Sequence, residues 1–221
     1  KQADREVEFL EPEEVERLLA APLEVRSKKL EVKSKKNPSH LLTSHFLLIT
    51  LRDKAILEVL FSTGMRVGEL AKLTRDDVNL DRDEFAVHGK GGKIRVVFLS
   101  PEAKTALARY LAGRRDLAPP LFVRHDRAIG KNPSTAAEQP LTPRSVERLV
   151  QRYARAAGIV KPVHPHTLRH SFATDLLRNG AQLRDVQAML GHASITTTQI
   201  YTHVTEGHLR SAHAKYHRKR T

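Results

Sequence analysis

The sequence contains no cysteine, which excludes disulfide bridges and thiol catalysis. A chain without thiols fits a reducing compartment, and we expect a cytoplasmic protein. No apolar run approaches the roughly 20 residues that a membrane-spanning helix needs. The opening KQADREVEFLEPEE is charged throughout and lacks the apolar centre of a signal peptide. These absences argue against a membrane protein and against a secreted disulfide scaffold.

Positive charge, in contrast, is present in excess. The 221 residues include 38 lysines and arginines against 25 acidic residues, a formal net charge of +13. In a chain long enough for one ordinary domain, this excess predicts a polyanionic partner. Nucleic acid is favoured over a membrane surface because the other features of membrane-binding proteins are missing. A solvated basic surface without a partner is the alternative.

Helix start and stop signals predict a mainly helical chain. Acidic residues around Pro12 complement the dipole of a first helix, and a long apolar-periodic segment runs from about Leu47 to Phe61. Cap–Pro pairs begin three more helices at Ser100, Thr142 and His164, and shorter helices follow from about 183 to 190 and from Ser194. The basic stretch Arg26 to His40 is predicted to be a surface insertion or mobile loop, and Gly130 to Pro140 a second loop.

One region is typical of β-structure. Glu84–His88 and Ile94–Leu99 are strand-like, and Gly89-Lys90-Gly91-Gly92 between them predicts a hairpin turn. Val78 and Leu80 are candidates for a third short strand. The expected fold class is therefore mainly α with a small antiparallel β-sheet (α+β).

Six side chains along the chain form an inventory for handling a phosphodiester. Arginines grip non-bridging oxygens bidentately, a histidine or lysine moves protons, and a hydroxyl attacks phosphorus to form a covalent intermediate. Taken singly, each such residue is more often an ordinary surface, turn or core residue, so the specificity lies in the ordered combination. The six candidates are Arg66, Lys90, His166, Arg169, His192 and Tyr201.

Three histidines, at 164, 166 and 170, raise the alternative of a metal site. His164 precedes the predicted helix, cysteine is missing, and no acidic ligand lies at a typical zinc spacing. We therefore expect no metal and no other cofactor.

Four segments resemble the signature of the tyrosine recombinases, most of all Xer-type recombinases and related phage-type integrases. They are TGMRVGELAKLTRDDV, HGKGGKIRVVFLS, HPHTLRHSFATDLLRNG and LGHASITTTQIYTHV, and the resemblance runs from about Leu10 to the end of the chain. The family's active-site order of Arg, Lys, His-x-x-Arg, His or Trp, and Tyr is filled by the six candidates above. The resemblance implies the catalytic-domain fold of this family and an active site-specific DNA recombinase.

The resemblance also implies a mechanism. Tyr201 would attack the scissile phosphate, leaving a 3′-phosphotyrosyl link and a free 5′-hydroxyl, and rejoining would need neither ATP nor a metal. The two arginines would neutralise charge on the pentacoordinate transition state, with Glu69 supporting Arg66. His166 would handle the tyrosine proton, Lys90 would protonate the leaving 5′-oxygen, and His192 would donate a hydrogen bond to a phosphate oxygen.

The expected partner is double-stranded DNA. Within Thr142–Ala157, Arg144, Arg148, Arg152 and Arg155 lie roughly opposite an apolar face, and the resemblance favours presenting this helix to DNA through Arg144 and Arg148. A solvated basic face is the alternative. The resemblance further implies that residues 1–10 are a linker remnant, that 11–221 are the catalytic domain, and that the family's N-terminal DNA-clamping domain is absent.

Assembly is implied in the same way. The tail after Tyr201 would dock on a neighbouring protomer and help to build a homo- or hetero-tetramer on paired DNA sites, while the fragment alone is expected to be monomeric, with no membrane partner. Two other functions are weighed, a non-catalytic DNA-binding protein of the same fold and a tyrosine-type topoisomerase. The intact set of six residues argues against the first, and the LGHASITTTQIYTHV segment against the second. Chromosome-dimer resolution and mobile-element integration both stay open.

Overall fold

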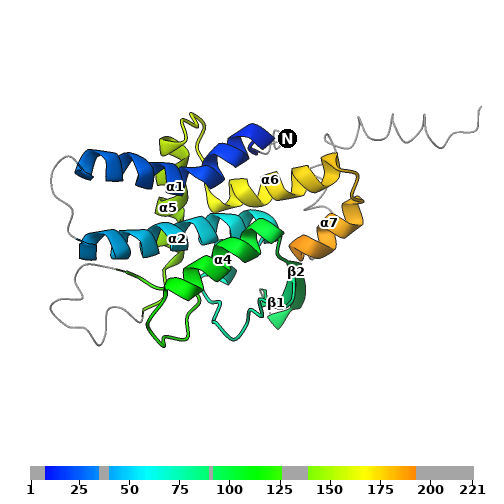
Figure 1. Ribbon diagram of the computed structural model, residues 1–221. Coiled ribbons are helices and arrows are strands. Elements are labelled where there is room, and N and C mark those ends of the chain that lie inside the picture. Colours follow the sequence, from blue (N-terminus) through cyan, green and yellow to red (C-terminus); the bar gives the residue numbers. More distant parts are fainter. Residues whose placement is uncertain (1–7, 35–39, 90–91, 126–138, 193–221) are drawn as a thin grey trace, which may run out of the picture.

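The computed structural model describes residues 8–34, 40–89, 92–125 and 139–192 (Figure 1). This part of the chain contains seven α-helices and one two-stranded antiparallel sheet, which confirms the expected α+β class with helix predominating. The helices are α1 (Pro12–Ser34), α2 (His40–Thr63), α3 (Val67–Leu70), α4 (Pro101–Gly113), α5 (Pro143–Ala156), α6 (Pro165–Arg178) and α7 (Leu183–Leu190). The strands are β1 (Glu84–His88) and β2 (Ile94–Phe98).

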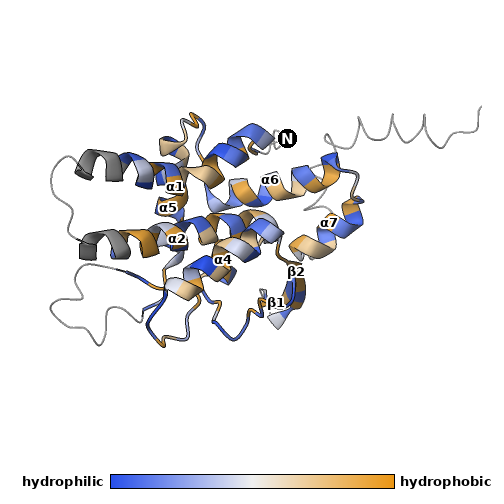
Figure 2. Ribbon diagram, in the orientation of Figure 1, coloured by the Kyte–Doolittle hydropathy of each residue, from blue (hydrophilic) through white to orange (hydrophobic). Residues whose placement is uncertain are grey.

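Helix α2 is the centre of the fold. It packs against α1, α4 and α6, and the six consecutive residues from Ala55 to Leu60 are all buried. A helix buried on all sides needs apolar residues on all sides, whereas the outer helices carry one apolar stripe each. Figure 2 shows this alternation of apolar and polar positions along α6 and α7. The main core therefore surrounds α2, and a smaller apolar cluster joins α6 to α7.

The predicted caps set the helix boundaries. Oγ of Ser100 accepts a hydrogen bond from the Ala103 N–H at 3.2 Å, and Oγ1 of Thr142 accepts one from the Ser145 N–H at 3.2 Å. Each cap is followed by a proline in the first turn, where a missing N–H costs nothing. The apolar face predicted for α5 is also confirmed, because Val146, Leu149, Val150 and Tyr153 are buried.

The predicted hairpin is confirmed, but the third strand is wrong. β1 pairs with β2 from Glu84↔Phe98 to His88↔Ile94. Within the described residues, Val78 and Leu80 belong to no strand. Between them, Oδ1 of Asn79 accepts a hydrogen bond from the Asp81 N–H at 2.8 Å, a local turn that competes with strand pairing.

The predicted loop from Arg26 to His40 is wrong as well. Helix α1 continues to Ser34 and α2 begins at His40, so only residues 35–39 lie between the two helices, outside the described residues. Lysine, glutamate, arginine and leucine are good helix formers, and the basic charge of this stretch therefore concealed a helical extension. The second predicted loop, apart from Gln139 and Pro140, and the helix predicted from Ser194 lie outside the described residues.

Candidate active site

Arg169 joins the C-terminal ends of two helices. Its Nη1 donates to the Gly64 carbonyl oxygen at 2.5 Å and its Nη2 to the Leu190 carbonyl oxygen at 2.7 Å. These oxygens lie at the ends of α2 and α7, where backbone acceptors have no partner within the helix. The residue is only 4% exposed, so its guanidinium is held in one orientation inside the protein.

Gly64 allows this arrangement. Its φ of 57° is in the left-handed region, and a Cβ there would lie 2.4 Å from Cδ1 of Phe172. A larger residue would be strained and would also collide with α6. The glycine of the Thr63-Gly64-Met65-Arg66 segment is therefore needed where α2, α6 and α7 meet.

Arg66 is held by Glu69 at the start of α3, a short helix that the sequence did not predict. Oε2 of Glu69 accepts a hydrogen bond from the Arg66 backbone N–H at 2.8 Å, and Oε1 accepts one from its Nη1 at 3.0 Å. The predicted support of Arg66 by Glu69 therefore has a direct geometric basis. The Arg66 side chain is 37% exposed, so it remains accessible to a ligand.

Arg95, on β2, completes this cluster, and sequence reasoning missed it. Its Nη1 and Nη2 donate to the two carboxylate oxygens of Glu69 at 3.0 and 2.7 Å, and its Nε donates to the Met189 carbonyl oxygen at 3.0 Å. Burial alone would raise the pKa of Glu69, but hydrogen bonds from Arg95 and Arg66 lower it to about 2. The available signal was the period of the strand, because residues two apart face the same side and Val97 is buried.

Two predicted histidines lie within the electrostatic reach of both arginines. His166 is exposed in the first turn of α6, and His192 is half-buried just after α7. Partial removal of the His166 ring from water lowers its pKa, and the charges of Arg169 and Arg66 lower it further. The same causes lower the pKa of His192 to about 4. Arg169 bonds the backbone of Gly64 and Leu190, which lie two residues from Arg66 and His192, so these side chains share one region with His166. The lowered pKa values favour neutral imidazoles at pH 7.

Lys90 and Tyr201 lie outside the described residues. The base of the hairpin that carries Lys90 is described: the Gly89 N–H donates to the Lys93 carbonyl oxygen at 2.7 Å. A Cβ on Gly89 would lie 3.6 Å from Oε1 of Glu69, so this end of β1 contacts the cluster of Arg66, Glu69 and Arg95.

The predicted basic face of α5 divides into two parts. Arg144 and Arg148 are exposed, as a DNA-contacting role requires. Arg152 instead reaches the buried carboxylate of Asp53, with Nη2 at 2.6 Å from Oδ2, and Tyr153 donates its hydroxyl to the same oxygen at 2.9 Å. Arg152 therefore links α5 to α2, while Arg144, Arg148 and Arg155 are exposed and available to a partner.

Within the described ranges, no group of three or more histidine, cysteine or acidic residues is arranged to hold a metal ion. In the same ranges, none of the helices combines the length and apolar character needed to cross a bilayer.

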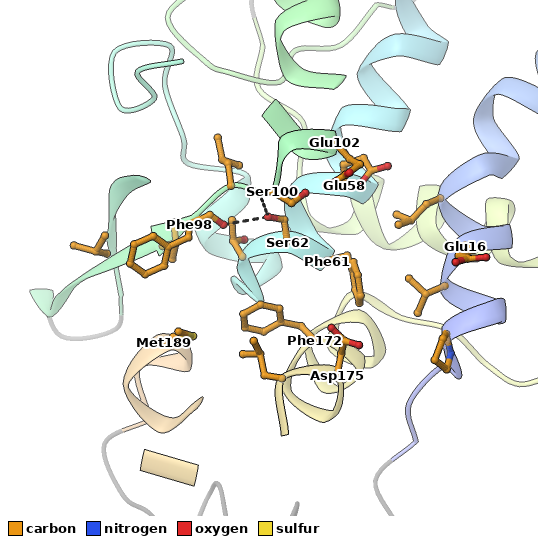
Figure 3. A pocket seen from close by; sticks show the side chains of 18 residues that line it. Glu16, Glu58, Phe61, Ser62, Phe98, Ser100, Glu102, Phe172, Asp175 and Met189 are labelled. Carbon is orange, nitrogen blue, oxygen red and sulfur yellow. Dashed lines mark hydrogen bonds between the residues drawn. The ribbon is translucent and has the colours of Figure 1, made fainter. Parts of the chain in front are cut away.

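A cavity of about 620 Å³ is lined by both apolar and acidic side chains (Figure 3). Val96 and Phe98 of β2 belong to this lining and are 46% and 48% exposed. The aromatic and thioether groups of the lining are those of Phe61, Phe98, Phe172 and Met189. The acidic groups are those of Glu16, Glu58, Glu102 and Asp175.

Comparison with known proteins finds recombinases among the chains similar to this one. The chain is 43% identical over 169 residues to the tyrosine recombinase XerC of Listeria innocua, covering 76% of this chain and 55% of that protein. The crystal structure of XerA recombinase superposes with a TM-score of 0.69 at 33% identity, covering 96% of this chain and 66% of the other. The XerH recombinase, in a post-cleavage complex with a palindromic difH substrate, superposes with a TM-score of 0.69 at 25% identity, covering 99% and 56%.

The chain spans about half the length of the XerC relative. The match to a family nevertheless covers almost all of this chain. Residues 8–208, which include all the segments that resemble recombinases, match the model of the phage integrase family. The chain therefore belongs to the phage integrase family.

Proposed function

We propose that this protein is a site-specific DNA recombinase, which cuts and rejoins double-stranded DNA through a 3′-phosphotyrosyl link to Tyr201. The observation that carries the proposal is the convergence of Arg66, His166, Arg169 and His192 in one region, in a chain of the phage integrase family. Two arginines and two neutral histidines can bind a phosphate and accept a proton beside it. The nucleophile and the acid for the leaving group are then supplied by Tyr201 and Lys90.

The arginines neutralise the charge of the pentacoordinate transition state. A guanidinium offers five N–H groups in a fixed plane, so Arg169 can hold two carbonyl oxygens and still present donors elsewhere. Because its orientation is set by Gly64 and Leu190 before DNA binds, little reorganisation is needed when the charge develops. Glu69 does the same for Arg66.

Proton transfer follows from the histidines and the lysine. Neutral His166 accepts the proton of the Tyr201 hydroxyl while the Tyr201 oxygen forms its bond to phosphorus. The bond from phosphorus to the 5′-oxygen breaks, and Lys90 supplies the proton to that oxygen. His192 donates a hydrogen bond to a phosphate oxygen. The reverse attack by a 5′-hydroxyl restores the phosphodiester and releases Tyr201, so the energy of the bond is conserved without ATP.

DNA is held largely through its phosphates. A formal net charge of +13 and the exposed Arg144 and Arg148 of α5 support this. Phosphate contacts provide affinity and register rather than sequence choice. In this proposal residues 11–221 act as the catalytic domain, residues 1–10 belong to an interdomain linker, and the protein works on DNA in the cytoplasm.

We also propose that protomers assemble as a homo- or hetero-tetramer on paired DNA sites. The tail Thr202–Thr221 has apolar residues at helical spacing and carries five basic residues against one acidic residue. This pattern complements the apolar and acidic side chains that line the cavity in Figure 3, and we assign the tail of a neighbouring copy to that cavity.

A charged residue in the cavity tests the assembly. Phe98→Asp should abolish the tetramer on a duplex with two sites, measured by native gel electrophoresis, while binding to a single site persists. Leu117→Asp changes an apolar residue that is 93% exposed outside the cavity and serves as the matched control. Tetramers formed equally well by the Phe98 variant would refute the assignment.

The recombinase activity itself is tested with Tyr201→Phe, which removes only the hydroxyl. On a nicked suicide duplex, the parent chain should form a covalent adduct that survives a denaturing gel, and the variant should bind DNA without forming it. An adduct of equal yield from the variant would refute the assignment of Tyr201. Binding without any adduct from the parent chain would favour the non-catalytic alternative, and relaxation of supercoils without site preference would favour a topoisomerase.

A further inference from the structure

We propose that Arg95 is a positioning residue of this site, which orients Arg66 through Glu69 and fixes the turn that leads to His192 through Met189. The inference rests on the recombinase function proposed above and extends the site to a residue outside the six that the family signature supplies.

The first observation is the way in which Arg95 and Arg66 share one carboxylate. Oε1 of Glu69 accepts hydrogen bonds from Nη1 of both arginines, at 3.0 Å each. Oε2 accepts from the Arg66 backbone N–H at 2.8 Å and from Nη2 of Arg95 at 2.7 Å. A bidentate guanidinium fixes the plane of a carboxylate, so the direction in which Glu69 presents Oε1 to Arg66 depends on Arg95.

The second observation is the contact of Arg95 with the end of α7. The hydrogen bond from Nε to the Met189 carbonyl oxygen lies beside the one that Arg169 makes to Leu190. Two guanidiniums therefore satisfy adjacent carbonyls at a helix C-terminus, where positive charge is also favoured by the helix dipole. His192 follows two residues after Leu190, so both arginines set the position from which it leaves α7.

Two glycines show how closely the backbone approaches Arg95. A Cβ on Gly191, whose φ is 65°, would lie 2.8 Å from Cδ of Arg95. A Cβ on Gly89 would lie 3.7 Å from its Nη1. The turn after α7 and the base of the Lys90 hairpin thus both lie close to the Arg95 side chain. Arg95 thereby connects the segments that carry Arg66, Lys90 and His192.

Arg95 acts through these neighbours and does not contact the phosphate. Each of its three side-chain nitrogens already donates within the protein, and its side chain is only 10% exposed. A buried ion pair contributes little net stability compared with apolar residues of the same volume. Stability alone therefore gives a weak reason for an arginine at this position, whereas control of geometry gives a direct one.

The test uses Arg95→Gln, Arg95→Lys and a matched control. The control is Lys104→Gln, which removes an exposed ion pair with Asp83 just before β1. Single-turnover cleavage of a nicked suicide duplex is measured at saturating DNA, below the melting temperature of every variant. A displacement of about 1 Å in catalytic groups can lower a rate about 100-fold, and we expect this fall for Arg95→Gln with DNA affinity within about threefold of the parent. Arg95→Lys, which keeps the charge without the fork, should recover part of the rate.

A second readout separates this inference from the recombinase proposal. Nuclear magnetic resonance titration of the His192 ring needs no cleavage. Burial and several positive charges lower the His192 pKa to about 4, and the loss of one of these charges, that of Arg95, should raise this pKa slightly. A parent chain that does not cleave would refute the proposed function, and the titration alone would then decide on Arg95. Cleavage by Arg95→Gln within about threefold of the parent would overturn the inference. An equal fall in Lys104→Gln, or an unchanged His192 titration, would overturn it too.

Discussion

Replacing Arg169 with lysine separates the charge of this residue from its shape. In the structure, the two terminal nitrogens of the planar guanidinium donate separately to the carbonyl oxygens of Gly64 and Leu190. A lysine offers a single ammonium nitrogen, so at least one of the two carbonyls loses its donor geometry. Because the side chain is 4% exposed, water cannot readily replace the lost partner.

The expected loss of stability follows from this geometry. A hydrogen bond from a charged donor contributes about 1.5–3 kcal/mol, so we take about 2 kcal/mol for one lost carbonyl partner. In a chain of this size, 1 kcal/mol corresponds to about 2–4 °C, which gives a melting temperature lower by about 4–8 °C. Removal of one preorganised donor lowers a catalytic rate about 10²–10³-fold, and we expect a fall of that order in cleavage with DNA binding much less affected.

Thermal unfolding by circular dichroism and single-turnover cleavage of a nicked duplex measure the two effects independently. Arg178→Lys is the matched control, since it makes the same change on the same helix. Arg178 pairs with Glu11, and the side chains of both residues are exposed. An unchanged melting temperature for Arg169→Lys would refute the role of Arg169 in joining α2 to α7. Normal cleavage would refute its role in the transition state.

Two further predictions concern solution conditions. If about four to six phosphates are contacted, the affinity for duplex DNA should fall by about two to three decades between about 50 and 200 mM salt. An affinity that does not change with salt in gel-shift titrations would contradict binding dominated by phosphate contacts. Burial is the main cause that lowers the pKa of His125, His170 and His192 to about 4 in the folded chain, and nearby positive groups add to it. The free energy of unfolding from these groups is therefore fully present above about pH 6.5 and is lost as pH falls toward 4. Each should contribute a slope of up to about 1.4 kcal/mol per pH unit, and equal free energies of unfolding in urea at pH 7.5 and 5 would contradict this.

Local chemistry made much of the fold predictable. Proline after a capping residue fixed the starts of α4, α5 and α6, and Gly191 fixed the end of α7, because these signals act within one helical turn. The stretch from Arg26 to Ser34 is helical although its charge predicts a loop, because its residues favour helix. Helix-forming tendency prevailed there over solvation.

Arg95 could not be found in this way. Its role depends on a contact with Glu69, 26 positions earlier, and on one with Met189, 94 positions later. Only the tertiary fold brings these residues together, and the strand pattern by itself indicates no more than an inward-facing arginine. The cavity in Figure 3 has the same origin, since it is lined by residues from α1, α2, β2, α4, α6 and α7.

The hydrogen bonds of Arg169 also have a consequence for protein synthesis. Its two carbonyl partners lie 105 positions before it and 21 positions after it. A nascent chain therefore holds Arg66 and Glu69 long before Arg169 can take its place, and Arg169 is not fixed until Leu190 has left the ribosome. In the recombinase proposed above, a chain interrupted before that point would have basic charge for binding DNA and would lack both the assembled arginine pair and Tyr201. The order of the sequence would thus delay strand cleavage until most of the chain has been made.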